Sequence, residues 1–335
     1  MQIFLQKINK LSELHFHACL EYRSIINSLY KGIYKGDTLE NIPFIPVTLF
    51  KEFNLKSIPD KNVFKILQSS GTQGKQSSIF LSRDNSRDQT IALKSLFQKQ
   101  FGNTRVPMVI FDSEQVIHNN FNLSARRAAI VGFSSFASER IFVLQDDLSL
   151  NHEILNQFLS HHKDTYFILF GFTFILWNAF FAGNDSSVPF KAPNAIILHG
   201  GGWKSLESLG ISKNEFKTQM KEKTGITKII DYYGMAEQAG SIFFECNFGY
   251  FHTSEYSNVI IRNPFSMTPV PFGQTGLVQV LSSLPSSYPG HSILTQDLGT
   301  LLGEDDCHCG EQGRYFTIES RLPNSQIRGC SDVGI

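Results

Sequence analysis

A short loop near position 70, rich in serine and glycine, has the residue types that bind phosphate. Its sequence is QSSGTQGK (residues 68–75), and it follows the apolar segment Val63–Leu67, which we interpret as a short strand. Hydroxyl groups, backbone N–H groups at glycines and a lysine ammonium all donate hydrogen bonds to phosphate oxygens. We therefore predict a phosphate site here, although the loop alone is equally typical of a surface turn. The candidate donors are Ser69, Ser70, Gly71, Thr72, Gly74 and Lys75.

The spacing within this loop argues against a Walker A motif. That motif places four residues between its first glycine and the Gly-Lys pair. Here only Thr72 and Gln73 separate Gly71 from Gly74 and Lys75. The P-loop fold is therefore disfavoured, while the phosphate-binding chemistry of the loop remains.

Three cysteines and one histidine in the last third of the chain are candidate metal ligands. Five residues separate Cys246 from His252, and one residue separates Cys307 from Cys309. Three thiolates and one imidazole complete a tetrahedral structural Zn²⁺ site. The spacings differ from those of zinc fingers but fit two loops of a β-rich region that come together. His308 is an alternative ligand, and buried reduced cysteines without a metal are the alternative interpretation.

The two remaining cysteines differ in their surroundings. Cys19 lies in the helical pattern LHFHACLEY, where a small buried residue is ordinary. Cys330 follows Arg328 and Gly329 on a tail that we expect to be mobile. Because nearby cationic charge favours the thiolate, Cys330 is a candidate nucleophile. A tail cysteine without a role is the alternative.

Charge and cysteine content limit the classes of partner. The 335 residues include 30 basic and 30 acidic side chains, so the chain lacks the excess positive charge that nucleic acids attract. The N-terminal sequence carries charges among its apolar residues, so we do not expect a secretory signal. We expect a cytoplasmic protein, in which the five cysteines stay reduced.

The elements that must position these residues indicate an α/β fold. Apolar strand-like runs alternate with helical patterns up to about residue 240, which is typical of layered α/β structure with parallel strands. We expect an N-terminal helical segment (1–60) packed on a main domain (61–335), whose β-rich part covers residues 241–330 and whose cysteine tail covers residues 328–335. The expected strands are Val106–Asp112, Arg140–Gln145, Thr165–Phe170, Ala195–Leu198 and Lys228–Tyr232, and the expected helices include Arg87–Phe101 and Leu150–His161.

The uncharged run Thr165–Gly183 approaches the length of a membrane span, about 20 residues. However, Gly171 interrupts it after a strand-like stretch, and no cluster of basic residues flanks it. A buried strand followed by a buried helix explains the run, so we expect no transmembrane segment. An apolar ligand pocket nearby would suit it.

Further stretches make the phosphate loop more specific. DYYGMAE at Asp231–Glu237 resembles the Tyr-Gly-x-Thr-Glu motif of adenylate-forming enzymes, and ILTQDLG at Ile293–Gly299 resembles their Thr-Gly-Asp motif. ESRLPNSQIRG at Glu319–Gly329 is similar to their hinge motif through Arg321 and the final Ile-Arg-Gly. GQTGLVQV at Gly273–Val280 falls where the family has a Gly-x-x-Gly-x-Leu strand. The resemblance implies the large N-terminal-type domain of these enzymes, with layered α/β sheets and a β-rich subdomain.

The resemblance also implies a reaction and residue roles. ATP and a carboxylic acid would give an acyl-adenylate and pyrophosphate, mainly through positioning and charge stabilisation. Tyr233 would stack on adenine, Asp231 would meet its amino group, Asp297 would bind the ribose hydroxyls and Glu237 would hold Mg²⁺. Glycines would let the backbone approach the nucleotide closely. These glycines are Gly200, Gly201, Gly202 and Gly234.

The sequence departs from the family pattern at two places. Ala236 stands where the family has threonine, so one hydroxyl donor to phosphate is missing. The sequence ends six residues after Gly329, so we expect the small C-terminal domain to be lacking, together with its lysine that contacts the reacting carboxylate. Lys75, Lys204 and Arg321 are the candidates to replace that lysine.

The chain length, the segment Ile42–Phe53 and the ending RGCSDV narrow the resemblance to LuxE-type acyl-protein synthetases. This implies activation of a fatty acid and transfer of the acyl group from AMP to Cys330, then to a partner protein of the fatty acyl reductase type. Related phenylacetate-CoA-ligase-like enzymes carry a similar zinc cluster. Two alternatives remain: adenylation with coenzyme A or a carrier protein as acceptor, and a nucleotide- and zinc-binding module without catalysis.

Overall fold

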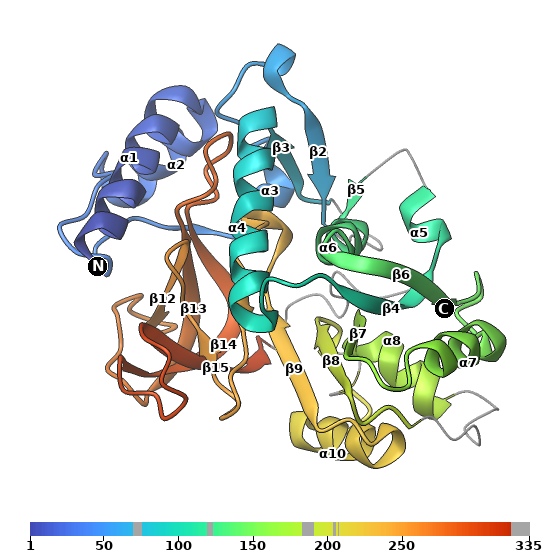
Figure 1. Ribbon diagram of the computed structural model, residues 1–335. Helices are drawn as coiled ribbons and strands as arrows, with labels where there is room; N and C mark the ends of the chain where they lie inside the picture. Colours follow the sequence, from blue (N-terminus) through green and yellow to red (C-terminus); the bar gives the residue numbers. More distant parts are fainter. Residues whose placement is uncertain (70–75, 119–122, 183–190, 204–205, 207, 323–335) are drawn as a thin grey trace. The chain divides into compact units, whose positions relative to one another are not determined.

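The computed structural model describes residues 1–69, 76–118, 123–182, 191–203, 206 and 208–322 (Figure 1). Within these residues the chain forms two compact units. The first unit contains residues 1–100 and 234–322, and the second contains residues 101–233. Both units combine helices with sheets, which confirms the α/β class predicted from the sequence.

A parallel sheet forms the centre of the second unit. Its strands have the spatial order β9-β8-β7-β4-β6, and each neighbouring pair is parallel. Every residue of β7 and β8 is buried, as expected for strands that are covered on both faces. The predicted parallel α/β layering is therefore confirmed. The strands are β4 (Val106–Ser113), β6 (Ala137–Leu144), β7 (Phe167–Phe172), β8 (Ala195–Gly200) and β9 (Lys228–Tyr233).

Local sequence explains where the helices of this unit begin and end. Asn151 caps α7, because its side chain accepts the backbone N–H of Ile154 at 3.2 Å. Gly225 ends α10 in the left-handed conformation, with φ of 71°. The remaining elements of this unit lie between these strands in the sequence. They are α5 (Gln115–His118), β5 (Leu123–Ser124), α6 (Ala125–Ser134), α7 (His152–His161), α8 (Thr173–Trp177), the π-helical turn η2 (Asn178–Ala182) and α10 (Lys213–Thr224).

The apolar run at residues 165–183 contains a buried strand followed by a helix, as predicted. The strand β7 begins at Phe167, two residues later than predicted, and extends to Phe172. The helix α8 and the turn η2 follow it directly. In the part of the chain that the structure describes, no helix has the length and apolar character needed to cross a membrane.

An antiparallel sheet dominates the first unit. Its order is β11-β15-β14-β13-β12, and β1 pairs in parallel with β14. The antiparallel region expected after residue 240 is thus confirmed. The strands are β1 (Ile45–Pro46), β11 (Phe251–His252), β12 (Ser257–Arg262), β13 (Thr275–Ser282), β14 (Ser292–Glu304) and β15 (Arg314–Arg321).

A hairpin carries the predicted phosphate loop of the first unit. Its strands β2 (Lys65–Gln68) and β3 (Ser78–Leu81) are antiparallel, and the loop connects them. The helix α4 (Arg83–Phe101) follows and begins four residues earlier than predicted. The other short elements are α3 (Leu49–Glu52), η1 (Asp60–Asn62), η3 (Ala236–Gln238) and β10 (Phe243–Phe244).

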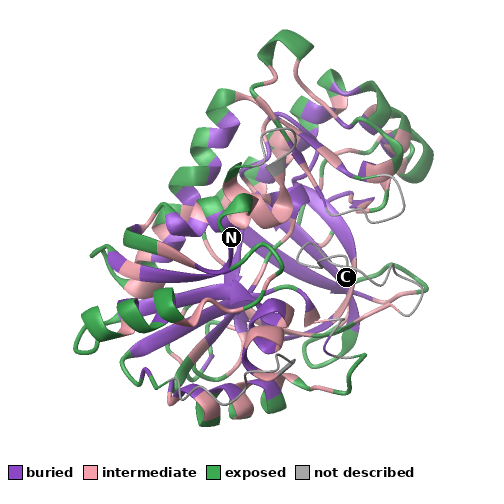
Figure 2. Ribbon diagram, turned by 90° about the vertical axis from the view of Figure 1, so that its right-hand side faces the viewer, coloured by how far each residue is buried: buried purple, intermediate pink, exposed green. Residues whose placement is uncertain are grey.

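Two N-terminal helices pack on the antiparallel sheet. They are α1 (Gln2–Ala18) and α2 (Leu20–Tyr30), and the buried Cys19 lies between them. A core cluster joins Ile8 of α1 to Ile260 of β12 and Leu281 of β13. Figure 2 colours the residues by burial: buried residues follow the strands, and exposed residues lie on the outer faces of the helices.

Candidate active site and metal centre

Glu237, the predicted Mg²⁺ ligand, lies on the short turn η3 in the first unit. The residue is 6 % exposed. Burial raises the pKa of its carboxyl group, while its own backbone N–H, the Ser77 hydroxyl and the cations Arg321 and Lys51 act in the opposite direction. A carboxylate oxygen is the type of ligand that a hard divalent cation prefers, so Glu237 is a candidate cation ligand.

The neighbouring residue fixes the turn that carries Glu237. The side-chain amide of Gln238 donates to the carbonyl oxygen of Gly290 at 2.8 Å and to that of Val280 at 3.1 Å. Gln238 is 1 % exposed, so water does not compete for these hydrogen bonds. The position of Glu237 is therefore defined by contacts with the region around β13 and β14. Ala236, where the family has threonine, is buried in the same turn.

Asp297 and Arg321 face each other across two strands of the antiparallel sheet. They are register partners in the β14–β15 pair, and Arg321 Nε lies 3.4 Å from Asp297 Oδ1. Arg321 is also one of the cations that lower the pKa of Glu237. The structure thus brings together three predicted site residues from separate parts of the sequence: Glu237, Asp297 and Arg321.

Of the predicted phosphate donors, Ser69 is the one that belongs to the described residues. Its Oγ accepts the backbone N–H of Ser77 at 3.0 Å, and its own backbone N–H donates to the Ser77 carbonyl at 3.1 Å. Both residues are buried, so these bonds hold the two ends of the loop together. The other predicted phosphate ligands lie outside the described residues. They are Ser70, Gly71, Thr72, Gly74 and Lys75.

A second polar cluster lies at the carboxyl ends of strands in the second unit. Asp231 on β9 is 2 % exposed, and its Oδ2 accepts the indole N–H of Trp203 at 2.9 Å. His199 on β8 is fully buried, with Nδ1 at 3.0 Å from Thr173 Oγ1 and 3.9 Å from Asp231 Oδ1. Burial, together with nearby lysines, lowers the pKa of His199, so its ring is neutral near pH 7. Tyr233, the predicted adenine-stacking residue, is half-buried at the end of β9.

The glycine run after His199 has a packing role. A Cβ atom on Gly200 would lie 2.5 Å from the carbonyl oxygen of Tyr232, so only glycine allows β8 and β9 to approach this closely. Gly201 and Gly202 adopt left-handed conformations, with φ of 67° and 74°. Gly234, predicted as a fourth glycine of the nucleotide site, lies in the first unit beside Ile242.

Sequence reasoning missed His199, Thr173 and Trp203, which form the polar cluster with Asp231. A signal was present, because His199 directly precedes the glycine run and Trp203 directly follows it. Ligand sites of parallel sheets lie at the carboxyl ends of the strands, so polar and aromatic residues there are candidates. Thr173, which follows β7, satisfies the same criterion.

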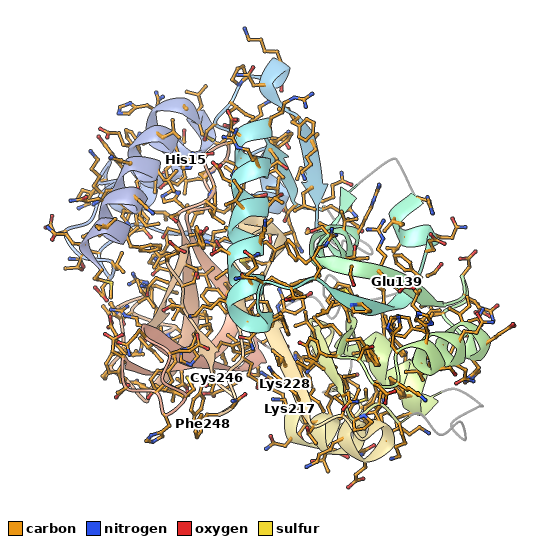
Figure 3. All side chains as sticks on the ribbon, viewed as in Figure 1. His15, Glu139, Lys217, Lys228, Cys246 and Phe248 are labelled. Carbon is orange, nitrogen blue, oxygen red and sulfur yellow. The ribbon has the colours of Figure 1, made fainter. Side chains whose placement is uncertain are left out.

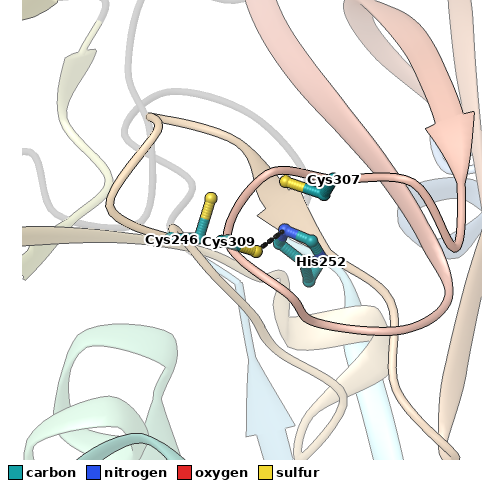
Figure 4. A group of neighbouring side chains, drawn as sticks. All are labelled: Cys246, His252, Cys307 and Cys309. Atoms are coloured by element: carbon teal, nitrogen blue, oxygen red, sulfur yellow. Dashed lines mark hydrogen bonds between the residues drawn. The ribbon is translucent and has the colours of Figure 1, made fainter.

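The predicted metal ligands come together in the first unit. Cys246 lies in a turn closed by hydrogen bonds with Gly249 and Tyr250, and His252 lies on β11. Cys307 and Cys309 lie in the loop between β14 and β15. The four ligand atoms are all within 4.8 Å of one another, with Cys309 Sγ at 3.3 Å from His252 Nε2 (Figure 4). These separations fit the ligands of one tetrahedral ion.

Burial determines the protonation of this cluster. Burial raises the pKa values of the Cys246 and Cys309 thiols and lowers that of the His252 imidazole. The thiols are therefore protonated near pH 7 unless a metal ion stabilises the thiolates. His308, the alternative ligand, is exposed and stands 5.9 Å from the Phe248 ring instead of joining the group of four.

Two other candidate residues lie outside the described residues: Lys204 and the proposed nucleophile Cys330. Cys19 is described and buried, and its thiol is 3.6 Å from Glu21 Oε2. Burial raises the pKa of the Cys19 thiol, which makes it a poor nucleophile. This agrees with its expected role as a small buried residue of the N-terminal helices.

Solved structures of adenylate-forming ligases have a similar fold. An open conformation of 2-hydroxyisobutyryl-CoA ligase, in complex with 2-HIB-AMP and CoA, has a TM-score of 0.75 at 15% identity, covering 96% of this chain and 75% of that chain. An ATP-bound RpMatB-BxBclM chimera has a TM-score of 0.52 at 15% identity, covering 79% and 49%. These likenesses confirm the predicted adenylate-forming fold.

Sequence comparisons agree with this fold. Two curated relatives are named long-chain-fatty-acid–luciferin-component ligase. The relative from Vibrio harveyi is 22% identical over 340 residues, covering 95% of this chain and 84% of the relative. The relative from Aliivibrio fischeri is 22% identical over 305 residues, covering 88% and 78%. The sequence profile of the LuxE acyl-protein synthetases matches residues 2–334, so this chain belongs to the LuxE family.

Proposed function

We propose that this chain converts a fatty acid and ATP into an acyl-adenylate and pyrophosphate, and then transfers the acyl group to a protein cysteine as a thioester. The observation that carries this proposal is the assembly of Glu237, Asp297 and Arg321 in one region of a LuxE-family chain. The names of the two relatives support a long-chain fatty acid as substrate and a protein as final acceptor.

In the first step, a carboxylate oxygen of the acid attacks the α-phosphorus of ATP, and the bond to pyrophosphate breaks. Asp297 accepts hydrogen bonds from the ribose hydroxyls. Arg321 holds Asp297 and has further guanidinium N–H groups that can pair with an anionic oxygen of the reactants. Mg²⁺ at Glu237 would offset the negative charge of the phosphates. The chain's own contribution is chiefly the positioning of these groups.

In the second step, the thiolate of Cys330 attacks the acyl carbonyl carbon, and AMP leaves with the bonding electrons. The neighbouring Arg328 supports the thiolate form of Cys330. Exchange with a thiol of a partner protein, of the fatty acyl reductase type, would then pass the acyl group on. Coenzyme A or a carrier protein is the alternative acceptor, and it requires no role for Cys330.

We also propose that Cys246, His252, Cys307 and Cys309 hold a structural Zn²⁺. The support is the mutual distance of the ligand atoms, all within 4.8 Å, and the choice of three sulfurs and one nitrogen. The ion would join the turn at Cys246 to the β14–β15 loop. Such ligands must stay reduced, which supports the cytoplasmic location expected from the sequence.

The decisive experiment labels the purified protein with ATP, Mg²⁺ and tritiated tetradecanoic acid, followed by peptide mapping. Label on the peptide that contains Cys330 would support acyl-protein synthesis. Labelled acyl-AMP without label on protein would keep the adenylation step but redirect the acyl group to coenzyme A or a carrier protein. ATP binding without acid-dependent pyrophosphate exchange would refute the enzymatic proposal and favour a non-catalytic nucleotide-binding module.

A further inference from the structure

The connection between β13 and β14, residues 283–291, is unusually buried for a loop. Each of its residues is buried or half-buried. Loops usually run over the surface, because buried backbone groups must find hydrogen-bond partners. Here the partners come from distant elements: Ser287 Oγ contacts the Phe80 carbonyl of β3 and Asn85 of α4. We call this segment the 283–291 connection.

One side of the 283–291 connection contacts the N-terminal helices. His291 Nε2 lies 3.0 Å from Ser12 Oγ of α1 and 3.4 Å from the Tyr22 hydroxyl of α2. The ring of His291 stacks on that of His15, with centroids 5.0 Å apart. His15, labelled in Figure 3, has Nε2 at 2.9 Å from the Pro285 carbonyl. Each of the four contacting side chains is at most 1 % exposed.

The hydrogen bonds define the form of the His291 ring. Ser12 donates its hydroxyl proton to the Ile8 carbonyl at 3.1 Å, so its oxygen is free to accept the N–H of His291 Nε2. Burial and the neighbouring His15 both lower the pKa of His291, so the ring is neutral near pH 7. His291 therefore acts as a neutral donor from the connection to α1.

The other side of the connection contacts the turn that carries Glu237. A Cβ atom on Gly290 would lie 2.5 Å from the Glu237 carbonyl oxygen and 2.3 Å from Tyr288 Cε2, so glycine is required. The Gly290 carbonyl accepts the side-chain amide of Gln238 at 2.8 Å. Tyr288 is fully buried, and burial and the charge of Glu237 both raise the pKa of its hydroxyl. Gly290, the residue before His291, thus packs against the backbone of Glu237.

We propose that His291 is a positioning residue for Mg²⁺ binding: it ties the 283–291 connection to α1 and α2 and thereby holds Gly290 against the backbone of Glu237. The N-terminal helices are then part of the adenylation machinery. This inference rests on the proposed function, in which Glu237 holds the cation. His291 itself touches neither substrate nor metal, and its influence passes through Gly290.

The test compares His291→Ala and His291→Gln with the wild type. Fatty-acid-dependent ATP–pyrophosphate exchange is measured against free Mg²⁺, with ATP and acid saturating. In His291→Ala, half-maximal exchange is expected to need up to about tenfold more Mg²⁺, the size of one lost buried hydrogen bond. A glutamine amide places an N–H close to the position of His291 Nε2. In His291→Gln, the Mg²⁺ concentration for half-maximal exchange is therefore expected to return close to the wild-type value.

Asn9→Ala is the matched control for loss of stability. The Asn9 side chain anchors α1 elsewhere, by bonds of 2.9 and 3.0 Å to the carbonyl and N–H of Gly36. This variant is expected to lower the Tm and leave the Mg²⁺ dependence unchanged. The inference is overturned if His291→Ala changes only the Tm, or if Asn9→Ala shifts the Mg²⁺ dependence as much as His291→Ala does.

Failure of the proposed function gives a separate result. If the wild-type protein shows no acid-dependent exchange, adenylation is refuted whatever the variants do. Binding of Mn²⁺ in the presence of ATP, followed by electron paramagnetic resonance, then compares the same three variants. Weaker Mn²⁺ binding in His291→Ala alone would support the link to Glu237, and equal binding in all variants would overturn it.

Discussion

Arg321 Nε lies 3.4 Å from Asp297 Oδ1, and the two residues are register partners across the β14–β15 pair. Their side chains therefore emerge on the same face of the sheet, side by side. Burial raises the pKa of Glu237, and the same arginine opposes this shift. One cation thus neighbours both carboxylates that are proposed to hold the nucleotide and its metal ion.

Asp297→Asn and Arg321→Ala are each expected to raise the KM for ATP by about tenfold, because each loses a charged hydrogen bond at the nucleotide site. The double variant should lose less than the product of the two effects, since the side chains act as a pair. Pyrophosphate exchange at varied ATP measures this. Arg314→Ala is the control on the same strand: Arg314 pairs with Glu40 and Glu304, so its loss should lower the Tm and leave the KM unchanged. A similar rise of KM in that control would contradict a specific role of Arg321.

Glu237→Gln is expected to lower exchange activity by roughly 100-fold, and to raise the Tm near neutral pH. The folded-state pKa of Glu237 is raised, so its contribution to stability is complete below the unfolded pKa and is lost as the pH rises through the folded pKa. The neutral amide avoids this loss. Unfolding followed by circular dichroism, without Mg²⁺, should show a gain that disappears in acid. A lower Tm at neutral pH would mean that the charge of Glu237 stabilises the fold.

The pH dependence of wild-type exchange follows from the same raised pKa. Activity should fall as the pH drops through the pKa of Glu237, at a higher pH than for an exposed glutamate, because the protonated carboxyl group does not bind Mg²⁺. More Mg²⁺ should move the midpoint to lower pH, since metal and proton compete for one group. Exchange rates measured over pH at two Mg²⁺ concentrations test this. A midpoint that is independent of Mg²⁺ would assign the titration to another group.

The parallel sheet could be predicted from the sequence because its strands are continuous apolar runs. Every residue of β7 is buried, so neither face needed a polar pattern, and the run stood out from its surroundings. The ends of the elements differ from the prediction: β7 begins two residues later and α4 four residues earlier than predicted. Tertiary contacts at the ends of elements decide such boundaries, and the local sequence does not contain them.

The candidate site was predictable where residue type restricts the chemistry. Cysteine and histidine are ligands that Zn²⁺ prefers, so Cys246 and Cys307 could be grouped although 61 positions separate them. His308 is an alternative ligand by sequence, and only the fold shows that it is exposed. The contact of Ser12 with His291 spans 279 positions between ordinary polar residues. Nothing in their types signals the pairing, which depends on how α1 packs on the sheet.

The double variant Cys246→Ser/Cys309→Ser is expected to lose stoichiometric zinc and to lower the Tm by about 3 °C or more, since a loss of about 2 kcal/mol would have that effect in a chain of 335 residues. Serine keeps the shape but removes the thiolates that the ion requires. Atomic absorption and thermal unfolding measure the two effects. Cys19→Ser is the matched control and should keep its zinc. Cys19 lies between α1 and α2 and does not belong to the group of four metal ligands. Wild-type protein purified without zinc, in the absence of chelators, would refute the metal site.

Cys330→Ser separates the two proposed chemical steps. The variant should retain acid-dependent pyrophosphate exchange, because the first step uses Glu237, Asp297 and Arg321 and no thiol. It should form no hydroxylamine-labile acyl-protein, because a serine hydroxyl is a much weaker nucleophile than a thiolate. Protein-bound tritiated acyl groups, counted before and after hydroxylamine, measure the second step.

The control is again Cys19→Ser, which should be labelled to the same extent as the wild type. Label that persists in Cys330→Ser at another cysteine would move the acyl-carrying role to that residue, and loss of exchange would show that Cys330 also serves the first step.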